Sequence, residues 1–422
     1  MNGYRRWWST LLFTSLLSLC GCGGGGGGGG DSVHIDDWDI YSKEFYVVIT
    51  TDLNGDGASD ILFTNFVVSQ KISCNYKPGD FKCKSKERES YYTVVYLQQS
   101  LSPGNFMSDK KYELAGMSVS AAAGDLNQDG IPDFTAAQLK EGTIRLFTDD
   151  GGVPGSFSSS VDFAAAMPAR CIAIGDLNGD SLNDMVVAGN DVVLLENNPA
   201  SPGSNFSSRS LAIENPSCVA IADINGDSRN DLVVTGADGV GVVLQDHAPA
   251  EGGNFLPVTW YPAGVGAIDV AVADLNGDSM PDMAVANSGD AIGSVSIYLQ
   301  DPLNVGEFFP ATLYSTAVNS NGVAIGDLNN DFLPDLAVAN NDPAGGSVSV
   351  LLQSVTGSGT FNPAVDYPGV NGPNDVAIDD LNGDGFADLV VADNSKMPKG
   401  SPYILFQDAN NPGVFLGRMQ LP

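Results

Sequence analysis

The chain has 422 residues, of which 51 are acidic and 19 basic, so its formal net charge is −32 at pH 7. A protein this acidic repels nucleic-acid phosphates and anionic lipid headgroups, so we expect no nucleic-acid partner. Hydrophobic residues make up 43% of the chain, enough apolar surface to bury a sizeable core, so the acidity does not indicate a disordered protein.

The first residues have the features of an export signal. Arg5 and Arg6 form a positive start, and the apolar stretch 11–19 follows them. This stretch is well below the ~20 residues that span a bilayer, so it indicates a signal peptide and not a membrane helix.

A lipid-attachment sequence follows the apolar stretch. Leu19-Cys20-Gly21-Cys22 resembles a bacterial lipobox, and Cys22 is the better candidate for lipidation because a small residue precedes it. Ordinary secretion with cleavage nearby is the alternative. We expect residues 1–21 to be removed, and residues 22–30, the lipidated Cys and a run of eight glycines, to form a flexible tether. The protein is then expected at the bacterial cell envelope, lipid-anchored at the outer membrane or cell surface, and in contact with the membrane only through its anchor.

A nine-residue, Asp-rich sequence occurs seven times, first at Asp52 and then at intervals of 73, 51, 47, 51, 53 and 53 residues. In each unit a short aliphatic run precedes it, a β-branched run follows it, a third run ends near a Gln, and a Gly-x-Phe turn opens a fourth. This pattern predicts an all-β fold, a seven-bladed β-propeller with four antiparallel strands per blade, over residues 31–422. The blades are expected to start near residues 45, 118, 170, 217, 268, 321 and 374.

The long first interval predicts an insertion at residues 66–91, between the second and third strands of the first blade. It contains Cys74, Cys83 and six of the basic residues. We expect a basic, disulfide-stapled loop there, which is either a recognition element on a rigid scaffold or a solvated loop without a partner.

Positions 1, 3, 5 and 9 of every Asp-rich loop are Asp, Asn, Asp and Asp, a spacing that turns oxygen ligands toward one centre. Oxygen ligands without Cys or His favour a hard cation, and flexible coordination favours Ca²⁺, so we predict up to seven calcium ions. The predicted ligands are Asp52, Asn54, Asp56, Asp60, Asp125, Asn127, Asp129, Asp133, Asp176, Asn178, Asp180, Asp184, Asp223, Asn225, Asp227, Asp231, Asp274, Asn276, Asp278, Asp282, Asp327, Asn329, Asp331, Asp335, Asp380, Asn382, Asp384 and Asp388.

A turn without a metal is the alternative, because Asn-Gly-Asp forms hairpin turns through Asx hydrogen bonds. That alternative leaves the Asp at position 9 unexplained, since strands are depleted in Asp. Position 6 favours residues that tolerate a positive φ, so the sixth loop, with Phe332 there, is the least certain site. We expect weak affinity, around 10⁻⁴ to 10⁻³ M, and a structural role for calcium.

The seven loops, in phase with the strand pattern, resemble the FG-GAP and VCBS repeat families, the calcium-binding propeller blades that also occur in integrin alpha subunits. The resemblance covers about residues 45–420. It implies the same propeller fold and calcium in the same loops.

The four cysteines beyond the leader are expected to form disulfides, since export places them in an oxidising compartment. Cys171 and Cys218 each lie five residues before a loop, in adjacent blades, which suggests a bond between them near the mouth of the central channel. Asp269 and Asp375 occupy the same position in the fifth and seventh blades, where we expect them to line that mouth.

The leading functional hypothesis is a monomeric, surface-anchored binding or adhesion module that recognises a protein or glycan on the face opposite the calcium loops. An extracellular enzyme of the polysaccharide lyase or phosphodiesterase type is the alternative, and a structural subunit of an envelope complex is a third. The chain has only two histidines and no Gly-x-Ser-x-Gly or His-rich metal motif, so we expect no enzymatic activity.

Overall fold

The computed structural model describes the chain from residue 38 onward. The described residues are 38–77, 80–98, 104–106, 110–139, 142–149, 155–165, 168–246, 254–289, 292–343, 345–354, 358–370, 372–394 and 402–421, without the side chains of 38–43, 45, 66 and 68–88. The predicted signal peptide, Cys22 and the glycine run therefore lie outside them.

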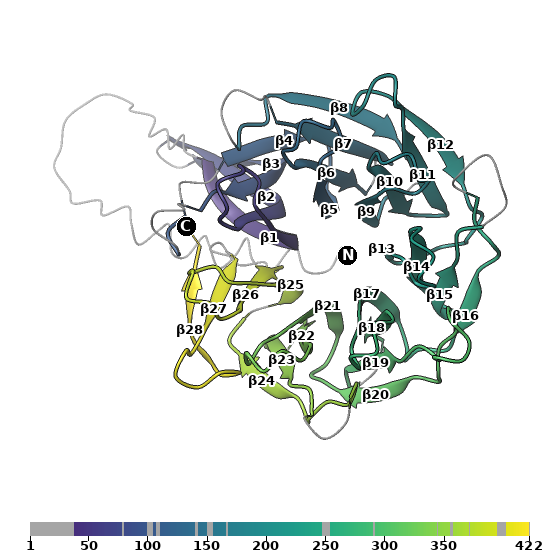
Figure 1. Ribbon diagram of the computed structural model, residues 1–422. Helices are drawn as coiled ribbons and strands as arrows, with labels where there is room; N and C mark the ends of the chain where they lie inside the picture. Colours follow the sequence, from purple (N-terminus) through teal and green to yellow (C-terminus); the bar gives the residue numbers. More distant parts are fainter. Residues whose placement is uncertain are drawn as a thin grey trace. The chain divides into compact units, whose positions relative to one another are not determined.

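The chain divides into two compact units. Of the described residues, those within 39–70 and 87–421 form one unit, and residues 38, 71–77 and 80–86 belong to the other. The first of these contains the repeated blades, whose sheets follow one another round a ring in Figure 1.

The described strands form seven four-stranded antiparallel sheets, so the predicted seven-bladed, all-β propeller is confirmed. Blades 1 to 7 are numbered in chain order, and within each the strands pair in sequence order. Blades 1 to 3 comprise β1 (Trp38–Thr51), β2 (Asp60–Lys77), β3 (Asp80–Tyr96), β4 (Lys110–Leu114); β5 (Ser118–Gly124), β6 (Asp133–Gln138), β7 (Thr143–Thr148), β8 (Ser159–Ala164); and β9 (Cys171–Gly175), β10 (Asp184–Ala188), β11 (Val192–Asn197), β12 (Phe206–Ser210).

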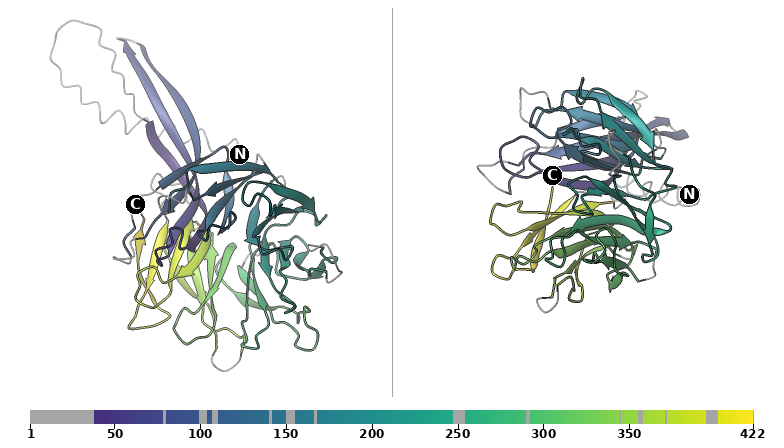
Figure 2. Two further views of the ribbon diagram at one scale, coloured as in Figure 1. Left: turned by 45° about the horizontal axis from the view of Figure 1, so that its top comes forward. Right: turned by 45° about the vertical axis from the view of Figure 1, so that its right-hand side comes forward.

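Blades 4 to 7 repeat this arrangement, and Figure 2 shows the same succession of sheets from two further directions. They comprise β13 (Val219–Ala222), β14 (Asp231–Gly236), β15 (Gly239–Val243), β16 (Thr259–Tyr261); β17 (Ala267–Ala273), β18 (Asp282–Asn287), β19 (Ser294–Tyr298), β20 (Thr312–Ser315); β21 (Ser320–Gly326), β22 (Asp335–Asn340), β23 (Ser347–Leu351), β24 (Val365–Pro368); and β25 (Pro373–Asp379), β26 (Asp388–Asp393), β27 (Tyr403–Gln407), β28 (Phe415–Gln420).

The first blade differs most from the sequence-based expectation. Its inner strand β1 begins at Trp38, ahead of the expected start near residue 45. The insertion at residues 66–91 is not an irregular loop, because β2 and β3 continue through it as strands. An antiparallel hairpin satisfies the backbone hydrogen bonds of such an insertion within itself.

The apolar core lies between neighbouring blades. The second strand of a blade is a short apolar run such as Asp282–Asn287 in β18, and all its residues are buried, because sheets cover both of its faces. Each of the seven hydrophobic clusters combines residues from two adjacent blades. Every sheet therefore depends on its neighbours for its stability.

The ring closes without exchange of a strand. Val48 and Ile61 of blade 1 pack in one cluster with Val390 and Ile404 of blade 7. The backbone N–H of Val48 also donates to a carboxylate oxygen of Asp375, at 3.0 Å. Residues 38–41, which precede the predicted start of the first blade near residue 45, belong to β1, the innermost strand of blade 1.

Aromatic pairs join the outer parts of consecutive blades. The ring of Tyr261 lies edge-on to Phe308 of the next blade, with centroids 5.6 Å apart, and Tyr367 contacts Phe415 in the same way at 5.4 Å. Trp260 packs against the cluster between blades 3 and 4. By sequence these aromatics are either sugar-stacking surfaces or blade packing, with packing favoured, and the contacts confirm packing between blades. The described residues include no helix that is long and apolar enough to span a bilayer.

Candidate functional site

Each Asp-rich loop connects the first and second strands of a blade and has the same backbone path in all seven. In the first loop, Asp52 accepts the N–H of Gly57 at 2.8 Å, Asn54 accepts that of Asp56 at 2.9 Å, and Asp56 accepts that of Ala58 at 2.9 Å. These are Asx-type turns, which fold the loop back on itself.

Position 6 of the loop has a positive φ in every blade, between 65° and 85°. The residues concerned are Gly57, Gly130, Ser181, Ser228, Ser279, Phe332 and Gly385. The expectation that this position must tolerate the left-handed region is confirmed, and Phe332 meets it with a side chain that is 92% exposed.

The Asp at position 9 is the first residue of the second strand, and it is fully buried in all seven blades. In blade 5, Asp282 accepts the N–H of Leu275 at 2.9 Å with one oxygen and that of Gln300 at 2.7 Å with the other. One carboxylate thus joins the start of the loop to the end of the third strand. The same pair of bonds occurs at Asp60, Asp133, Asp184, Asp231, Asp335 and Asp388.

Burial is the largest cause of a raised pKa at these seven carboxyls. It raises the pKa of Asp133, Asp231 and Asp282 to about 6 and that of Asp60, Asp184, Asp335 and Asp388 to about 7. The negative charge of the Asp at position 5 adds to the shift, while the two backbone N–H bonds oppose it. A buried carboxylate beside other carboxylates is an environment that a cation would stabilise.

The candidate side-chain ligands of each loop are all oxygen atoms, which are the ligands that calcium prefers. In the second loop the Asn127 amide lies 3.0 Å from an oxygen of Asp129 and 3.4 Å from one of Asp133, so positions 3, 5 and 9 meet. As they stand, however, the described residues include no group of three or more His, Cys, Asp or Glu side chains arranged to hold a metal ion. Calcium in these loops stays a prediction.

The argument that only a metal accounts for position 9 was wrong. The carboxylate has a structural role of its own, because it satisfies two backbone N–H groups that would otherwise be buried without a partner. Sequence reasoning missed this role, although the Gln at the end of the third strand, which supplies one of those N–H groups, was visible in five blades.

The same Gln also connects neighbouring blades. The Gln353 side chain donates to the backbone carbonyl of Leu275 in the preceding blade, at 2.9 Å, and Gln245 donates to that of Leu177. In blade 3, Asn197 takes this place and donates to Leu126 at 2.8 Å. A buried hydrogen-bond network thus runs from blade to blade through the loops.

A central cavity of about 590 Å³ lies at the other end of the inner strands, where these strands begin. Nearly half of its described lining residues are aliphatic, among them Val48, Ile172, Val219 and Val270. The polar side chains of the lining are Tyr46, Ser120, Arg170, Ser217, Asn321, Asn374, Asp269 and Asp375.

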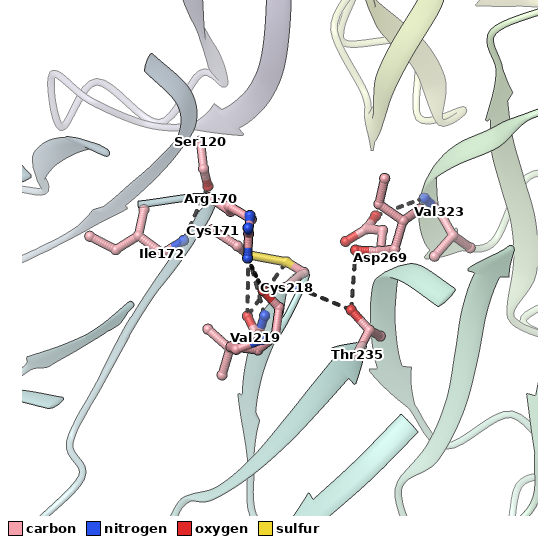
Figure 3. Close-up of a disulfide and its surroundings, with 11 residues drawn as sticks. Ser120, Arg170, Cys171, Ile172, Cys218, Val219, Thr235, Asp269 and Val323 are labelled. Carbon is pink, nitrogen blue, oxygen red and sulfur yellow. Dashed lines mark hydrogen bonds between the residues drawn. A yellow bond between two sulfur atoms is a disulfide. The ribbon is translucent and has the colours of Figure 1, made fainter. Parts of the chain in front are cut away.

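A disulfide joins Cys171 of blade 3 to Cys218 of blade 4 at the wall of this cavity, as predicted (Figure 3). The two residues are 47 positions apart in the chain and 4.9 Å apart between Cα atoms. Figure 3 shows Ser120 and Arg170 beside the disulfide and Asp269 across from it. The prediction that Asp269 and Asp375 line the channel mouth is also confirmed.

The residue five places before each loop makes a hydrogen bond to the next blade in four cases. Ser120 accepts the N–H of Ile172, Cys171 that of Val219, Asp269 that of Val323 and Asp375 that of Val48, at 2.9 to 3.3 Å. These bonds fix adjacent inner strands to one another around the cavity.

Two predicted sites and both histidines lie outside the described parts of the structure. They are the lipidation site Cys22, the side chains of Cys74 and Cys83, and the two histidines, His34 and His247.

Solved structures with related architecture share little sequence with this chain. A lectin from Agrocybe aegerita that recognises non-reducing terminal N-acetylglucosamine has a TM-score of 0.48 at 17% identity, over 78% of this chain and 80% of the lectin. The exotype rhamnogalacturonan lyase YesX has a TM-score of 0.47 at 12% identity, over 86% and 74%. Chaetomium thermophilum Sqt1 has a TM-score of 0.50 at 12% identity, over 90% and 88%, a likeness of fold alone.

No curated protein matches the sequence. A family model described as FG-GAP-like repeat matches residues 125–187, 176–234, 223–285, 274–338 and 327–391, which together span more than half of the chain. The chain therefore belongs to the FG-GAP-like repeat family.

Proposed function

We propose that this protein is a non-catalytic binding module of the bacterial cell envelope, stabilised by calcium and anchored through a lipid on Cys22. Its ligand is a protein or glycan that binds at the end of the propeller opposite the Asp-rich loops. The observation that carries the proposal is that the two ends of the inner strands differ: one end holds seven similar acidic loops, and the other opens on a mostly apolar cavity.

The calcium part of the proposal is supported by the repetition of one loop conformation. In each blade a buried Asp at position 9 lies near the carboxylates of the same loop, and its pKa is raised by burial and by their charge. Asp and Asn oxygens are the ligands that calcium prefers, and binding at several loops would offset the −32 charge of the chain. Calcium would then stabilise the folded protein by mass action.

The binding part is supported by the character of the central cavity. Ligand pockets of about 300–1,000 Å³ with apolar walls and a few converging polar groups are typical of small-molecule and sugar sites. The aromatic side chains Trp260, Tyr261 and Tyr367 pack between blades, so the proposed site is the cavity and not these rings.

Two experiments test the proposal. The mature protein, from residue 22, is screened on a glycan array and in pull-downs from envelope extracts, with calcium and with excess EDTA. Specific capture that depends on calcium supports a calcium-stabilised binding module. Turnover of a polysaccharide or phosphodiester substrate, with no stable binding partner, overturns it in favour of an enzyme.

The anchor is tested separately with the full-length chain in a bacterial host. Metabolic labelling with a radioactive fatty acid should label the protein, and Cys22→Ser should remove the label while Cys20→Ser should not. Equal labelling of the Cys22→Ser variant contradicts the assignment of Cys22.

A further inference from the structure

The two long strands of blade 1, β2 and β3, pair with each other, and their register can be read at the outer end. β2 ends at Lys77 and β3 begins at Asp80, so two positions separate the strands along the chain. A two-residue connection in an antiparallel hairpin places the flanking residues opposite each other. Lys77 is therefore opposite Asp80.

The inner end of the hairpin gives the same register. Asp60 accepts the N–H of Gln98 at 2.7 Å, and an equivalent bond occurs in each of blades 2 to 7. In those six blades the residue numbers of opposite positions add to one less than those of the bonded pair. In blade 1 opposite positions therefore add to 157, as Lys77 and Asp80 do. Because both ends agree, the pairing has no net shift between them.

Every charged residue of the outer hairpin, 71–77 and 80–86, falls on one face. Successive residues of a strand alternate between faces, so odd positions of β2 share a face with even positions of β3 in this register. We call this face the basic face. It carries six charged residues, which are Lys71, Lys77, Lys82, Lys84, Lys86 and Asp80. The opposite face carries no charge, and on it Cys74 is opposite Cys83.

The stability of the hairpin does not explain this arrangement. Lys71 and Lys86 are opposite each other, and like charges at opposite positions of a sheet destabilise it. Lysines that serve only solubility could occupy either face. Their restriction to one face, in spite of the repulsion, indicates an anionic partner that lies against this face.

The charge of this segment is opposite to that of the rest of the chain. Residues 71–86 contain five lysines and one acidic residue, which leaves 14 basic and 50 acidic residues for the remainder. Repulsion between the remainder and an anionic surface falls off over a Debye length of about 8 Å in physiological salt. The basic face is therefore the part of the chain that an anionic surface would attract.

The start of the described chain favours a membrane as that surface. β1 pairs with β2, and in blades 5 and 6 the residue just before the loop is opposite the Asp at position 9. The same pairing places Thr51 opposite Asp60, and 13 positions further along both strands it places Trp38 level with Ser73, within about one position. Cys22 precedes Trp38 by 16 positions, which span at most about 55 Å of extended chain. A lipid on Cys22 would thus hold the outer hairpin near the membrane.

We propose that the basic face of the blade 1 hairpin binds the anionic lipid headgroups of the membrane that holds the lipid on Cys22. The inference rests on the proposed anchor for the choice of an anionic membrane over other anionic partners. It adds a second membrane contact, carried by the protein itself.

The test uses the mature protein, from residue 22, with Cys22→Ser so that no lipid contributes. Flotation is measured with vesicles of phosphatidylcholine, and of phosphatidylcholine mixed with phosphatidylglycerol, in calcium and in excess EDTA. We expect binding to the mixed vesicles alone, in both buffers, and weaker binding as the salt concentration rises.

A matched pair of variants tests the face. Lys84→Gln should weaken binding to the mixed vesicles by about fivefold, the factor that one lysine near an anionic surface contributes. Ser85→Glu changes the net charge by the same amount at the next position, on the opposite face, and should weaken binding by less than about twofold. If Lys84→Gln does not fold, Lys82→Gln replaces it.

Three results overturn the inference: no binding to the mixed vesicles, equal binding to neutral vesicles, or equal losses in the two variants. Binding that requires calcium also overturns it, because calcium then bridges the acidic loops and the headgroups. Self-association that Lys84→Gln abolishes, without vesicle binding, assigns the face to a second copy of the chain and rejects a membrane contact. Fatty-acid labelling of Cys22 without vesicle binding rejects this inference alone, whereas vesicle binding without labelling rejects the anchor and keeps the basic face.

Discussion

The side-chain amide nitrogen of Gln300 lies 3.0 Å from the backbone carbonyl oxygen of Ile224, although 76 positions separate the two residues in the chain. The same amide group donates to Pro281, and its oxygen accepts the N–H of Gly306 at 2.9 Å. One buried side chain thus connects the fourth blade, the fifth loop and the turn that precedes the fourth strand of blade 5.

Replacement of this amide should destabilise the ring. In Gln300→Leu the carbonyls of Ile224 and Pro281 lose a buried donor, and we expect a loss of about 1–3 kcal/mol in the free energy of unfolding. Urea unfolding followed by circular dichroism measures it. The control Thr312→Leu, at an exposed position of β20 in the same blade, should change stability by less than about 0.5 kcal/mol. Equal effects of the two substitutions contradict the role given to Gln300.

Calcium should reverse the effect that neutralising a loop carboxylate has on the melting temperature. In Asp278→Asn a carboxylate that raises the pKa of Asp282 becomes neutral. In excess EDTA this variant should melt at or above the temperature of the unaltered protein, since repulsion falls. In millimolar calcium it should melt below it, since a ligand is lost. Scanning calorimetry in both buffers is the measurement, and no response of the unaltered protein to calcium contradicts the metal prediction.

The buried Asp residues at position 9 should also make stability depend on pH. Their folded pKa values, about 6 to 7, lie above the ordinary value near 4. Between these values the folded protein holds more protons than the unfolded chain, so without metal stability falls as the pH rises from about 4 to 7. Calcium competes with those protons for the carboxylates. It should therefore flatten or reverse the dependence of stability on pH. A melting temperature in EDTA that rises across this range would contradict the shifts.

The disulfide between blades 3 and 4 should contribute measurably to the free energy of unfolding. It closes a loop of 47 residues, and we expect the double variant Cys171→Ser, Cys218→Ser to lose about 2–4 kcal/mol in the free energy of unfolding. Reduction of the unaltered protein should produce a similar loss in urea unfolding. A double variant of unchanged stability would show that the bond adds nothing to the packing around it.

Phe332 should be replaceable with a gain in stability. Its φ is 65° and its side chain is 92% exposed. The left-handed backbone is therefore strained, and burial of the ring does not offset that strain. Phe332→Gly should raise the free energy of unfolding by about 0.5–1 kcal/mol, less than the full strain because glycine is more flexible in the unfolded chain. Ser279→Gly at the same position of blade 5 is the matched control, and a loss of stability in Phe332→Gly would indicate a contact made by the ring.

The sequence predicts those features whose cause is local. The Asp-rich loops, the positive φ at position 6 and the pairing of Asp282–Asn287 with its neighbours follow from short patterns. The Cys171–Cys218 bond is also predictable, because equal distances from two loops place both residues at the same level of adjacent blades.

Features that depend on distant partners are not predictable in this way. The acceptor of Gln300 belongs to another blade, and no pattern near Gln300 identifies Ile224. The approach of Asp375 to Gly322 depends on the packing of β25 against β21 and on one missing side chain. The cavity exists only when all inner strands are in place, so its polar residues Arg170 and Asn321 have no signature in the sequence.

The absence of strand exchange at closure has a mechanical consequence. The polypeptide passes through six of the seven junctions between adjacent sheets, but β1 to β4 and β25 to β28 each come from one continuous stretch. Among the described residues, the junction between them is joined by packing and by bonds such as Val48 to Asp375. Tension applied at the N-terminal end acts first on β1, which lies beside the junction between blades 1 and 7. We therefore expect a pulled molecule to open there first and to release its sheets in chain order.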